Sequence, residues 1–169
     1  NSVNSFLAEE QKHGRRLAYS KVFLSDIRNQ YAELTASSLY TNVLSQAPCS
    51  IVGQSPLNGC KTAVLVKTTD LDESLTFHSM RLTEEEAFQH SSYLQTLSLF
   101  NKYIDYLKEN NLDMSTHLVR TWIYITDIDV NYNGVVKARN DIFRQYGLTA
   151  DTHYVASTGI GGDSQSGHA

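Results

Sequence analysis

Residues 117–129 alternate between two kinds of side chain with a period of two, which is typical of a β-strand. One face of this strand is apolar enough for a core and holds Val119, Thr121, Ile123 and Ile125. The opposite face holds Arg120, Trp122 and Tyr124. Because one face is sufficient to cover a core, the guanidinium group and the two aromatic rings are candidates for another task.

Helical periodicity follows this strand. Residues 131–146 carry an apolar stripe at spacings of three and four, and Gly147 after them is a typical helix end. An earlier segment, residues 31–44, has a similar stripe and is closed by Pro48, which cannot continue a helix. The sequence thus predicts two strand–helix pairs of similar design.

A third helix is predicted between these two. Thr83 and Glu86 have the spacing of a capping box, apolar residues then recur at spacings of four and three, and Asn110 with Asn111 ends the helix. The remaining patterns are short. They predict a helical stub over residues 5–13 and strands over residues 60–68 and 74–82.

The chain also resembles itself. Residues 21–31 align with residues 121–132, because the apolar positions agree, both strands end in Ser/Thr-Asp-Ile, and a tyrosine follows in each. Residues 50–59 then align with residues 153–162, and each segment leads into a glycine turn. This pattern predicts two copies of one unit, made of strand, Ser/Thr-Asp turn, helix, strand and glycine turn.

We therefore expect an α+β fold of two related units in tandem, residues 1–70 and 71–169, with a mixed sheet and helices packed on one face. The first unit has only the stub over residues 5–13 before its strand. The second lacks a counterpart of the strand at residues 60–68, because residues 163–169 have the composition of an extended, exposed tail. Either the chain is a piece of a longer protein, or a partner supplies the missing edge.

Composition narrows the function classes. A chain of 169 residues with 41% hydrophobic and 19% charged residues suits an ordinary globular protein. A net charge of -4 without a basic stripe disfavours nucleic acid as a partner. No apolar segment reaches the length of a membrane span and no signal peptide is recognisable, so we expect a cytoplasmic protein. The histidines show no ligand spacing, and we expect no metal and no cofactor.

The order of strand, Ser/Thr-Asp turn, helix, strand, glycine turn and strand resembles the RidA/YjgF superfamily, also described as L-PSP endoribonuclease-like. The motifs are VFLSD at residues 22–26 and IYITDID at residues 123–129. The resemblance implies a chorismate-mutase-like fold and a homotrimer with pockets between subunits. It covers roughly residues 5–68 and 74–162. RTWIY, STGIGG and the tandem arrangement resemble the chorismatase-like branch, hydrolases that remove pyruvate from chorismate.

The chain departs from the deaminases of that superfamily at their substrate site. Those enzymes grip the substrate carboxylate with an arginine five positions before the last valine of the strand that enters the glycine turn. Here the positions are Ala47, before Val52, and Ala150, before Val155. The acidic residue that the deaminases carry on the following strand has no match either. The imine-hydrolysis site is thus missing from both units, and the catalytic residues are unknown.

Arg120, Trp122 and Tyr124 are the first candidates for binding a small carboxylate. A guanidinium group can donate two parallel hydrogen bonds to the carboxylate oxygens while the rings exclude water. The same residues could instead cover a sheet face or fill an ordinary interface.

Four further candidates follow along the chain. Arg139 lies on the apolar stripe of its helix and is either a second carboxylate anchor or an edge residue paired with an aspartate. Tyr154 precedes the second glycine turn. In that turn Thr158 and Gly159 either present backbone N–H groups to an anion or only build the turn.

Two functions of different class follow. The first is a hydrolase, imine deaminase-like or chorismatase-like, that acts on a carboxylate-bearing metabolite at a subunit interface. The second is a non-catalytic Rid-like module that binds a metabolite or builds an assembly. Ala47 and Ala150 favour the second function, whereas the row of Arg120 favours the first. Endoribonuclease activity ranks last, because an aromatic-basic platform for single strands is missing.

Overall fold

The computed structural model describes residues 2–70, 74–88 and 91–165. The chain divides into two compact units, Asn1–Ser79 (unit 1) and Met80–Ala169 (unit 2). The described residues contain seven α-helices, a three-stranded mixed sheet and a two-stranded parallel sheet, which confirms the predicted α+β class. The boundary predicted after residue 70 lies within unit 1.

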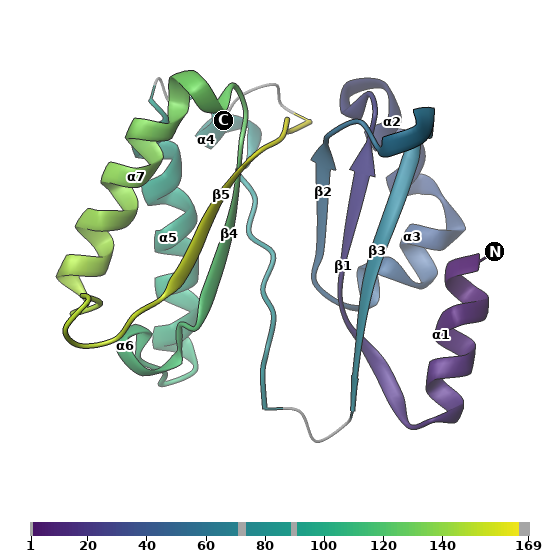
Figure 1. Ribbon diagram of the computed structural model, residues 1–169, viewed down its shortest axis with the longest axis horizontal. Coiled ribbons are helices and arrows are strands. Elements are labelled where there is room, and N and C mark those ends of the chain that lie inside the picture. The colour runs from purple at the N-terminus through teal and green to yellow at the C-terminus, as the bar shows by residue number, and fades with distance from the viewer. Residues whose placement is uncertain (1, 71–73, 89–90, 166–169) are drawn as a thin grey trace. The chain divides into compact units, whose positions relative to one another are not determined.

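Unit 1 is a three-stranded sheet with helices (Figure 1). Its elements are α1 (Ser2–Lys12), β1 (Arg15–Leu24), α2 (Ile27–Ala36), α3 (Ser38–Asn42), the 3-10 turn η1 (Leu44–Gln46), β2 (Cys49–Gly53), the 3-10 turn η2 (Leu57–Gly59) and β3 (Thr62–Asp70). The strand order is β2-β1-β3, in which β2 runs parallel and β3 antiparallel to β1. The stub and the three strands predicted for this unit are therefore present.

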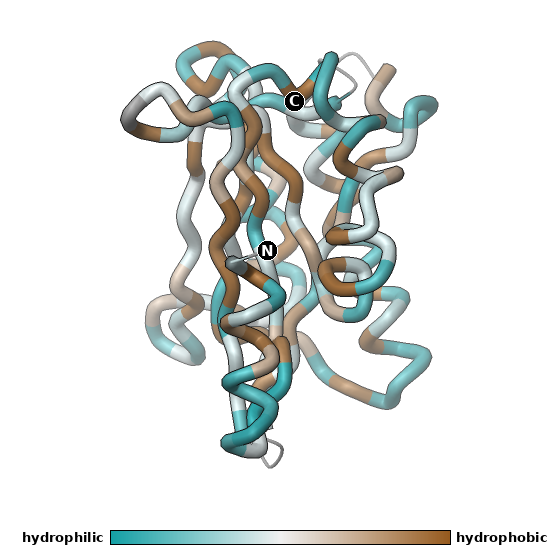
Figure 2. Tube along the Cα trace, turned by 90° about the vertical axis from the view of Figure 1, so that its right-hand side faces the viewer, coloured by the Kyte–Doolittle hydropathy of each residue, from teal (hydrophilic) through white to brown (hydrophobic). Residues whose placement is uncertain are grey.

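The core of unit 1 lies between one face of this sheet and the helices. Val22 and Leu24 of β1 are fully buried together with Leu44, and partly buried residues of α1, α2, α3 and β3 pack against them. Every second residue of β1 faces this core, as the alternation predicts. Figure 2 shows the hydrophobic residues along the strands of unit 1 and the hydrophilic end of α1.

Serine and aspartate side chains set where the helices of unit 1 begin. Asp26 caps α2 by accepting a hydrogen bond from the backbone N–H of Asn29 at 3.2 Å. Ser37 interrupts the helix predicted over residues 31–44: its backbone is extended, and its hydroxyl accepts from the N–H of Tyr40. A serine at this position starts a new helix because its side chain satisfies an N–H that would otherwise lack a partner.

Unit 2 packs two long helices on a two-stranded sheet. Its elements are α4 (Glu84–Ala87), α5 (Ser92–Glu109), α6 (Met114–His117), β4 (Arg120–Ile125), α7 (Ile128–Gln145) and β5 (Ala156–Gly161). β5 runs parallel to β4. A buried cluster joins α5, α6, α7 and the segments that lead into the two strands; its members are Phe100, Ile104, Leu107, Met114, Leu118, Ile142, Leu148 and Val155.

The long helix predicted after Thr83 is only partly correct. Thr83 and Glu86 do form a capping box, with both of its hydrogen bonds present. However, α4 ends at Ala87, and α5 starts anew with Ser91 as its N-cap, which accepts from the N–H of Leu94 at 3.2 Å. Residues 89–90 between them lie outside the described residues.

The strand predicted over residues 74–82 is wrong. The described residues of this segment take part in no ladder. Side chains of this segment instead contact the strands of unit 1. The Ser79 hydroxyl donates to the carbonyl of Cys49 at 3.1 Å, and the centre of the Phe77 ring lies 4.6 Å from that of the Tyr19 ring. Alternating apolar residues are therefore used here for packing against strands rather than for pairing with one.

The glycine turn predicted at residues 157–162 is also wrong, because most of it forms β5. Pairing then fixes a different alignment of the two units. Leu24 lies opposite Gly53 in unit 1 and Ile125 lies opposite Gly161 in unit 2, whereas the sequence alignment matched Gly53 to Ala156. Both units join two parallel strands through helices, and the first strands of the two predicted copies, β1 and β4 (Arg120–Ile125), are both strands in the structure. The tandem duplication itself stays a prediction.

The turn after β4 differs from its counterpart in unit 1. Asp127 has a left-handed backbone, with φ of 46°, and its side chain makes no capping hydrogen bond. Asn131 instead donates to the carbonyl of Thr126 at 2.8 Å. Of the predicted tail, Asp163 takes part in an isolated bridge, and residues 166–169 lie outside the described residues. The described part of the chain has no helix both long and apolar enough to cross a membrane.

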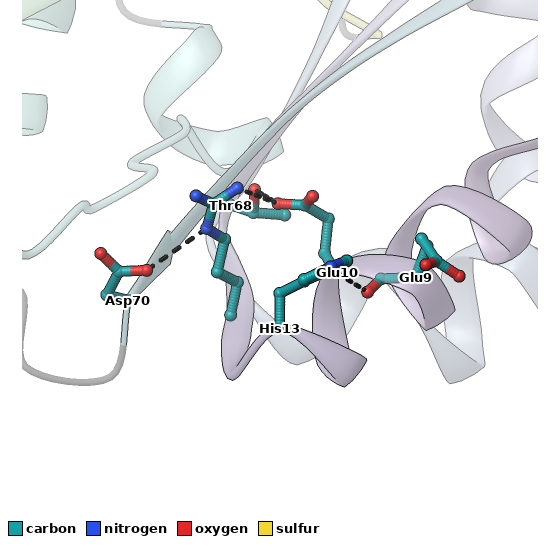
Figure 3. Close-up of polar contacts among 6 residues, drawn as sticks. Glu9, Glu10, His13, Thr68 and Asp70 are labelled. Atoms are coloured by element: carbon teal, nitrogen blue, oxygen red, sulfur yellow. Dashed lines mark hydrogen bonds and ion pairs between the residues drawn. The ribbon is translucent and has the colours of Figure 1, made fainter.

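Polar contacts attach α1 to the sheet (Figure 3). The side chain of Glu10, only 15% exposed, accepts from the Thr68 hydroxyl and from the Arg15 guanidinium at 3.3 Å. Arg15 also donates to Asp70 at 3.3 Å. The Thr68 hydroxyl is the main cause that holds the pKa of Glu10 below its ordinary value, and Arg15 adds to it. The cluster connects α1, β1 and β3.

Unit 2 depends on a close crossing of α5 and α7. A Cβ atom at Gly134 would lie 2.2 Å from the Ser92 Oγ and 3.0 Å from the backbone nitrogen of Tyr93. The Ser92 hydroxyl donates to the carbonyl of Asn131, and the Tyr93 hydroxyl donates to Asp141, both at 3.0 Å. Glycine is therefore required at position 134 because a side chain has no room there. The backbone conformation does not require it, because Gly134 has no positive φ.

We predict that Gly134→Ala lowers the free energy of unfolding by about 1–3 kcal/mol, because an added methyl group overpacks this crossing. At an ordinary helix position the same change would stabilise the helix by about 1 kcal/mol. Urea unfolding measures the difference, and the exposed neighbour Asn133 supplies the control Asn133→Ala, with an effect within about 0.5 kcal/mol. A Gly134→Ala protein as stable as the wild type would contradict the close approach.

A second prediction concerns the pH dependence of stability. The pKa of Glu10 is lower in the folded than in the unfolded chain, so its stabilising contribution is present above the unfolded pKa and is lost as the pH falls through the folded pKa. Thr68→Val should therefore lower the melting temperature at about pH 7 more than at about pH 3. Thr62→Val, an exposed change on the same strand, is the control. An equal deficit of Thr68→Val at both pH values would refute this role of Glu10.

Candidate functional site

The two faces of the β4–β5 sheet have different surroundings. Ile123 packs toward the buried cluster of unit 2. On the same face, a Cβ atom at Gly159 would lie 3.0 Å from the ring of Tyr132, and one at Gly161 would lie 3.4 Å from Ile128, both residues of α7. Small residues on β5 therefore let α7 approach this face. The alternate residues of both strands lie on the opposite face.

The face opposite α7 brings four of the predicted residues together. Arg120, Trp122 and Tyr124 follow one another on β4, and Thr158 of β5 is paired with Trp122. Ile160, paired with Tyr124, completes the row. Arg120 and Thr158 are exposed, whereas the two aromatic residues are half-buried. We call these five residues the Arg120 face.

The Arg120 guanidinium is held against an aromatic ring. Its Cζ atom lies 4.8 Å from the centre of the Trp122 ring, which is a cation–π contact. At exposed sites such a contact contributes about 0.5–1 kcal/mol, enough to favour one arrangement of a flexible arginine. The side chain stays exposed to solvent while the ring restricts it. The arrangement can thus present N–H groups to a planar carboxylate.

Gly159 does not belong to this face. It lies in the middle of β5 and, by the alternation of the strand, toward Tyr132 and α7. The tight turn predicted around it is wrong, because the segment is a strand paired with β4, and anion binding by the N–H of Gly159 stays a prediction. Thr121 and Ser157, on the face toward α7, join the two strands through a hydrogen bond of 2.8 Å between their hydroxyl groups.

Arg139 lies on α7 and so on the other side of the sheet from Arg120. Its guanidinium donates to the Oδ1 of Asn140 at 2.8 and 3.2 Å, and its Cζ lies 5.9 Å from the ring of Phe143. The structure therefore does not bring it to the carboxylate anchor as a second cation. It has the geometry of an arginine at the edge of an apolar stripe.

Tyr154 lies before β5 with 81% of its surface exposed, outside the row of paired strand residues. The neighbouring His153 places its Nε2 3.0 Å from the carbonyl of Leu118 and thereby ties the entrances of β5 and β4 together. Within the described part of the chain, no three side chains of the metal-binding types gather in one place.

One feature of unit 1 escaped the sequence interpretation. Tyr19, Lys21 and Phe23 alternate on β1 in the same way as the residues of the Arg120 face, and the Nζ of Lys21 lies 5.7 Å from the centre of the Tyr19 ring. The signal was available in the sequence, because β1 alternates like β4. It was missed for two reasons. Lys21 lies between its two aromatic residues, whereas Arg120 precedes both of its own, and lysine is common on exposed strands.

No family model, no curated protein and no solved structure matches the chain. Function must therefore be argued from the residues of the site.

Proposed function

We propose that the chain is a Rid-like small-molecule protein whose Arg120 face binds the carboxylate of a metabolite. The observation that supports this is the contact of 4.8 Å between the Arg120 guanidinium and the Trp122 ring on an exposed sheet position. Arginine can grip both oxygens of a carboxylate, and a ring beside it lowers the competition from water. Thr158 adds a hydroxyl on the same face.

Two versions of this function differ in whether a reaction follows binding. In the catalytic version the protein is a hydrolase of the imine deaminase-like or chorismatase-like kind, in which water is added and a C–N or C–O bond of the bound metabolite is broken. In the other version the protein binds the metabolite, or builds an assembly, without a reaction. Both need the Arg120 face, and the catalytic residues of the first are unassigned.

The pairing of the strands favours the version without imine hydrolysis. Ile160 lies relative to β4 as Val52 lies relative to β1. The residue five positions before Ile160 is Val155, and the residue five positions before Val52 is Ala47. The arginine of the deaminases is therefore missing from unit 2 in the alignment by strand pairing. It is also missing in the alignment by sequence, where Ala150 takes that position. A carboxylate anchor in this chain therefore has to come from another strand, and Arg120 is our candidate.

We further propose that the chain forms a homotrimer in which the site is completed at a subunit interface. In the described residues, β4 and β5 each have one neighbouring strand, so each has an edge whose backbone groups can accept a partner. A row of two aromatic residues and an arginine is also typical of residues enriched at interfaces.

The chain offers a direct measurement of carboxylate binding, because Trp122 is its only tryptophan. We predict that pyruvate changes the tryptophan fluorescence with saturation and that methyl pyruvate, which lacks the charge, does not. Arg120→Gln should raise the dissociation constant by about tenfold or more, since hydrogen bonds to charged groups contribute about 1.5–3 kcal/mol. The dissociation constant of Arg120→Lys should lie between those of the wild type and of Arg120→Gln, because lysine keeps the charge but cannot donate two parallel hydrogen bonds to the carboxylate.

Arg28→Gln is the matched control, since Arg28 is an exposed arginine of unit 1 and should leave the titration unchanged. If Arg120→Gln and the wild type bind pyruvate equally, the Arg120 face is not the carboxylate site. Assays of pyruvate release from chorismate and of ammonia release from an imine then separate the two versions: turnover that Arg120→Gln abolishes supports the hydrolase, and binding without turnover supports the non-catalytic module.

For the assembly we predict a mass of three chains by light scattering at micromolar concentration. Arg120→Glu, which places like charges where copies would meet, should shift the protein toward smaller species, whereas Arg28→Glu should not. A monomer at all accessible concentrations would refute the trimer, and with it a site that is shared between subunits.

A further inference from the structure

The Arg120 face places an exposed hydroxyl group beside the exposed guanidinium group. Arg120 is paired with Ala156 and Trp122 with Thr158, so Thr158 is the diagonal neighbour of Arg120 on β5. Neighbouring strands lie about 4.8 Å apart and rise about 3.3 Å per residue, which puts the two Cα atoms about 8 Å apart. The guanidinium group is turned toward this neighbour, because it lies 4.8 Å from the ring of Trp122, the residue paired with Thr158.

The protein itself satisfies neither of these two polar groups. In the part of the chain that the structure describes, the Arg120 guanidinium contacts the Trp122 ring and takes part in no ion pair or hydrogen bond, and the Thr158 hydroxyl takes part in no hydrogen bond. The other face of the same strands differs, because the hydroxyl groups of Thr121 and Ser157 bond to each other there at 2.8 Å. The Arg120 face thus keeps a cation and a hydroxyl group available to a ligand.

A carboxylate bound at the Arg120 face meets no negative charge on β4 or β5. Ala156, which is paired with Arg120, has a side chain of one methyl group and adds little bulk beside the guanidinium. None of the other residues on this side of the two strands is acidic. The positive charge of Arg120 is therefore not offset by its neighbours on the sheet.

We propose that the Arg120 face recognises a 2-hydroxy acid, with Arg120 on the carboxylate and Thr158 on the hydroxyl group at the neighbouring carbon. This inference rests on the proposed carboxylate binding and adds a second point of recognition to it. Two hydrogen bonds of about 2.9 Å, joined by the carbon atoms between carboxylate and hydroxyl group, cover a diagonal of about 8 Å. The Thr158 hydroxyl can donate or accept, so it matches a hydroxyl group, which does both, better than an oxo oxygen, which only accepts.

The test compares four small acids by the fluorescence of Trp122 at about pH 7, where each is ionised. The acids are propionate, lactate, 3-hydroxypropionate and pyruvate. We expect lactate to bind about threefold to tenfold more tightly than propionate, the factor that one neutral hydrogen bond contributes. 3-Hydroxypropionate, whose hydroxyl group is one carbon farther from the carboxylate, should bind like propionate, and pyruvate should bind more weakly than lactate.

Three results with the wild-type protein would overturn the proposal. Lactate that binds no more tightly than propionate leaves the second point of recognition without support. Equal binding of lactate and 3-hydroxypropionate contradicts the assignment to the neighbouring carbon. Pyruvate that binds as tightly as lactate, or more tightly, contradicts the choice of a hydroxyl group over an oxo group.

Thr158→Val removes the hydroxyl group and keeps the shape of the side chain. It should bring the dissociation constant of lactate to that of propionate and leave propionate unchanged, whereas Thr158→Ser should keep the preference for lactate. Thr62→Val is the matched control, because Thr62 is an exposed strand threonine of unit 1, and it should leave both constants unchanged. Arg120→Gln should weaken lactate and propionate by the same factor.

The variants separate the failure of this inference from the failure of carboxylate binding. If Arg120→Gln leaves the binding of propionate unchanged, the Arg120 face is not a carboxylate site and both proposals are refuted. If Arg120→Gln weakens both acids but Thr158→Val keeps the preference for lactate, carboxylate binding stands and the role of Thr158 is overturned.

Discussion

The structure of each unit depends on one constraint, the parallel pairing of two strands that follow each other in the chain. Parallel neighbours cannot be joined by a tight turn, so the connecting chain has to cross the sheet. In unit 1 α2 and α3 make this connection between β1 and β2, and in unit 2 α7 makes it between β4 and β5. The crossing helices bury one face of each sheet, and the choice of residues on that face follows from it.

On the sheet face that the helices cover, the size of the strand side chains matches how closely the helices approach. Val22 and Leu24 fill the core of unit 1, where the connecting helices are short and interrupted at Ser37. In unit 2 the single long helix α7 comes close enough that Gly159 and Gly161 lie beneath it. Side-chain volume on a strand and the distance of the covering helix thus compensate for each other, because protein interiors are packed without large voids.

The opposite faces share another property, a cation held against an aromatic ring. Lys21 lies over Tyr19 in unit 1, and Arg120 lies over Trp122 in unit 2. Such residues suit a half-buried sheet face, because their apolar parts cover the strands and their charged ends reach solvent. Strands hold side chains more rigidly than loops do, so cations placed in this way are well positioned for a small anion. Our proposal for the Arg120 face rests on this arrangement.

The sequence by itself determined the elements that depend on neighbouring residues. Alternation predicted β4 together with the face that carries Arg120, helical spacing predicted α7, and the Thr83–Glu86 capping box is present as predicted. These patterns act over a few residues, so the sequence shows them directly. Only the tertiary structure decided that a glycine-rich segment forms β5, since a strand without side-chain volume is stable when a helix covers it closely. It also decided that Arg139 lies across the sheet from Arg120, because a helix stripe does not reveal which sheet face it will cover.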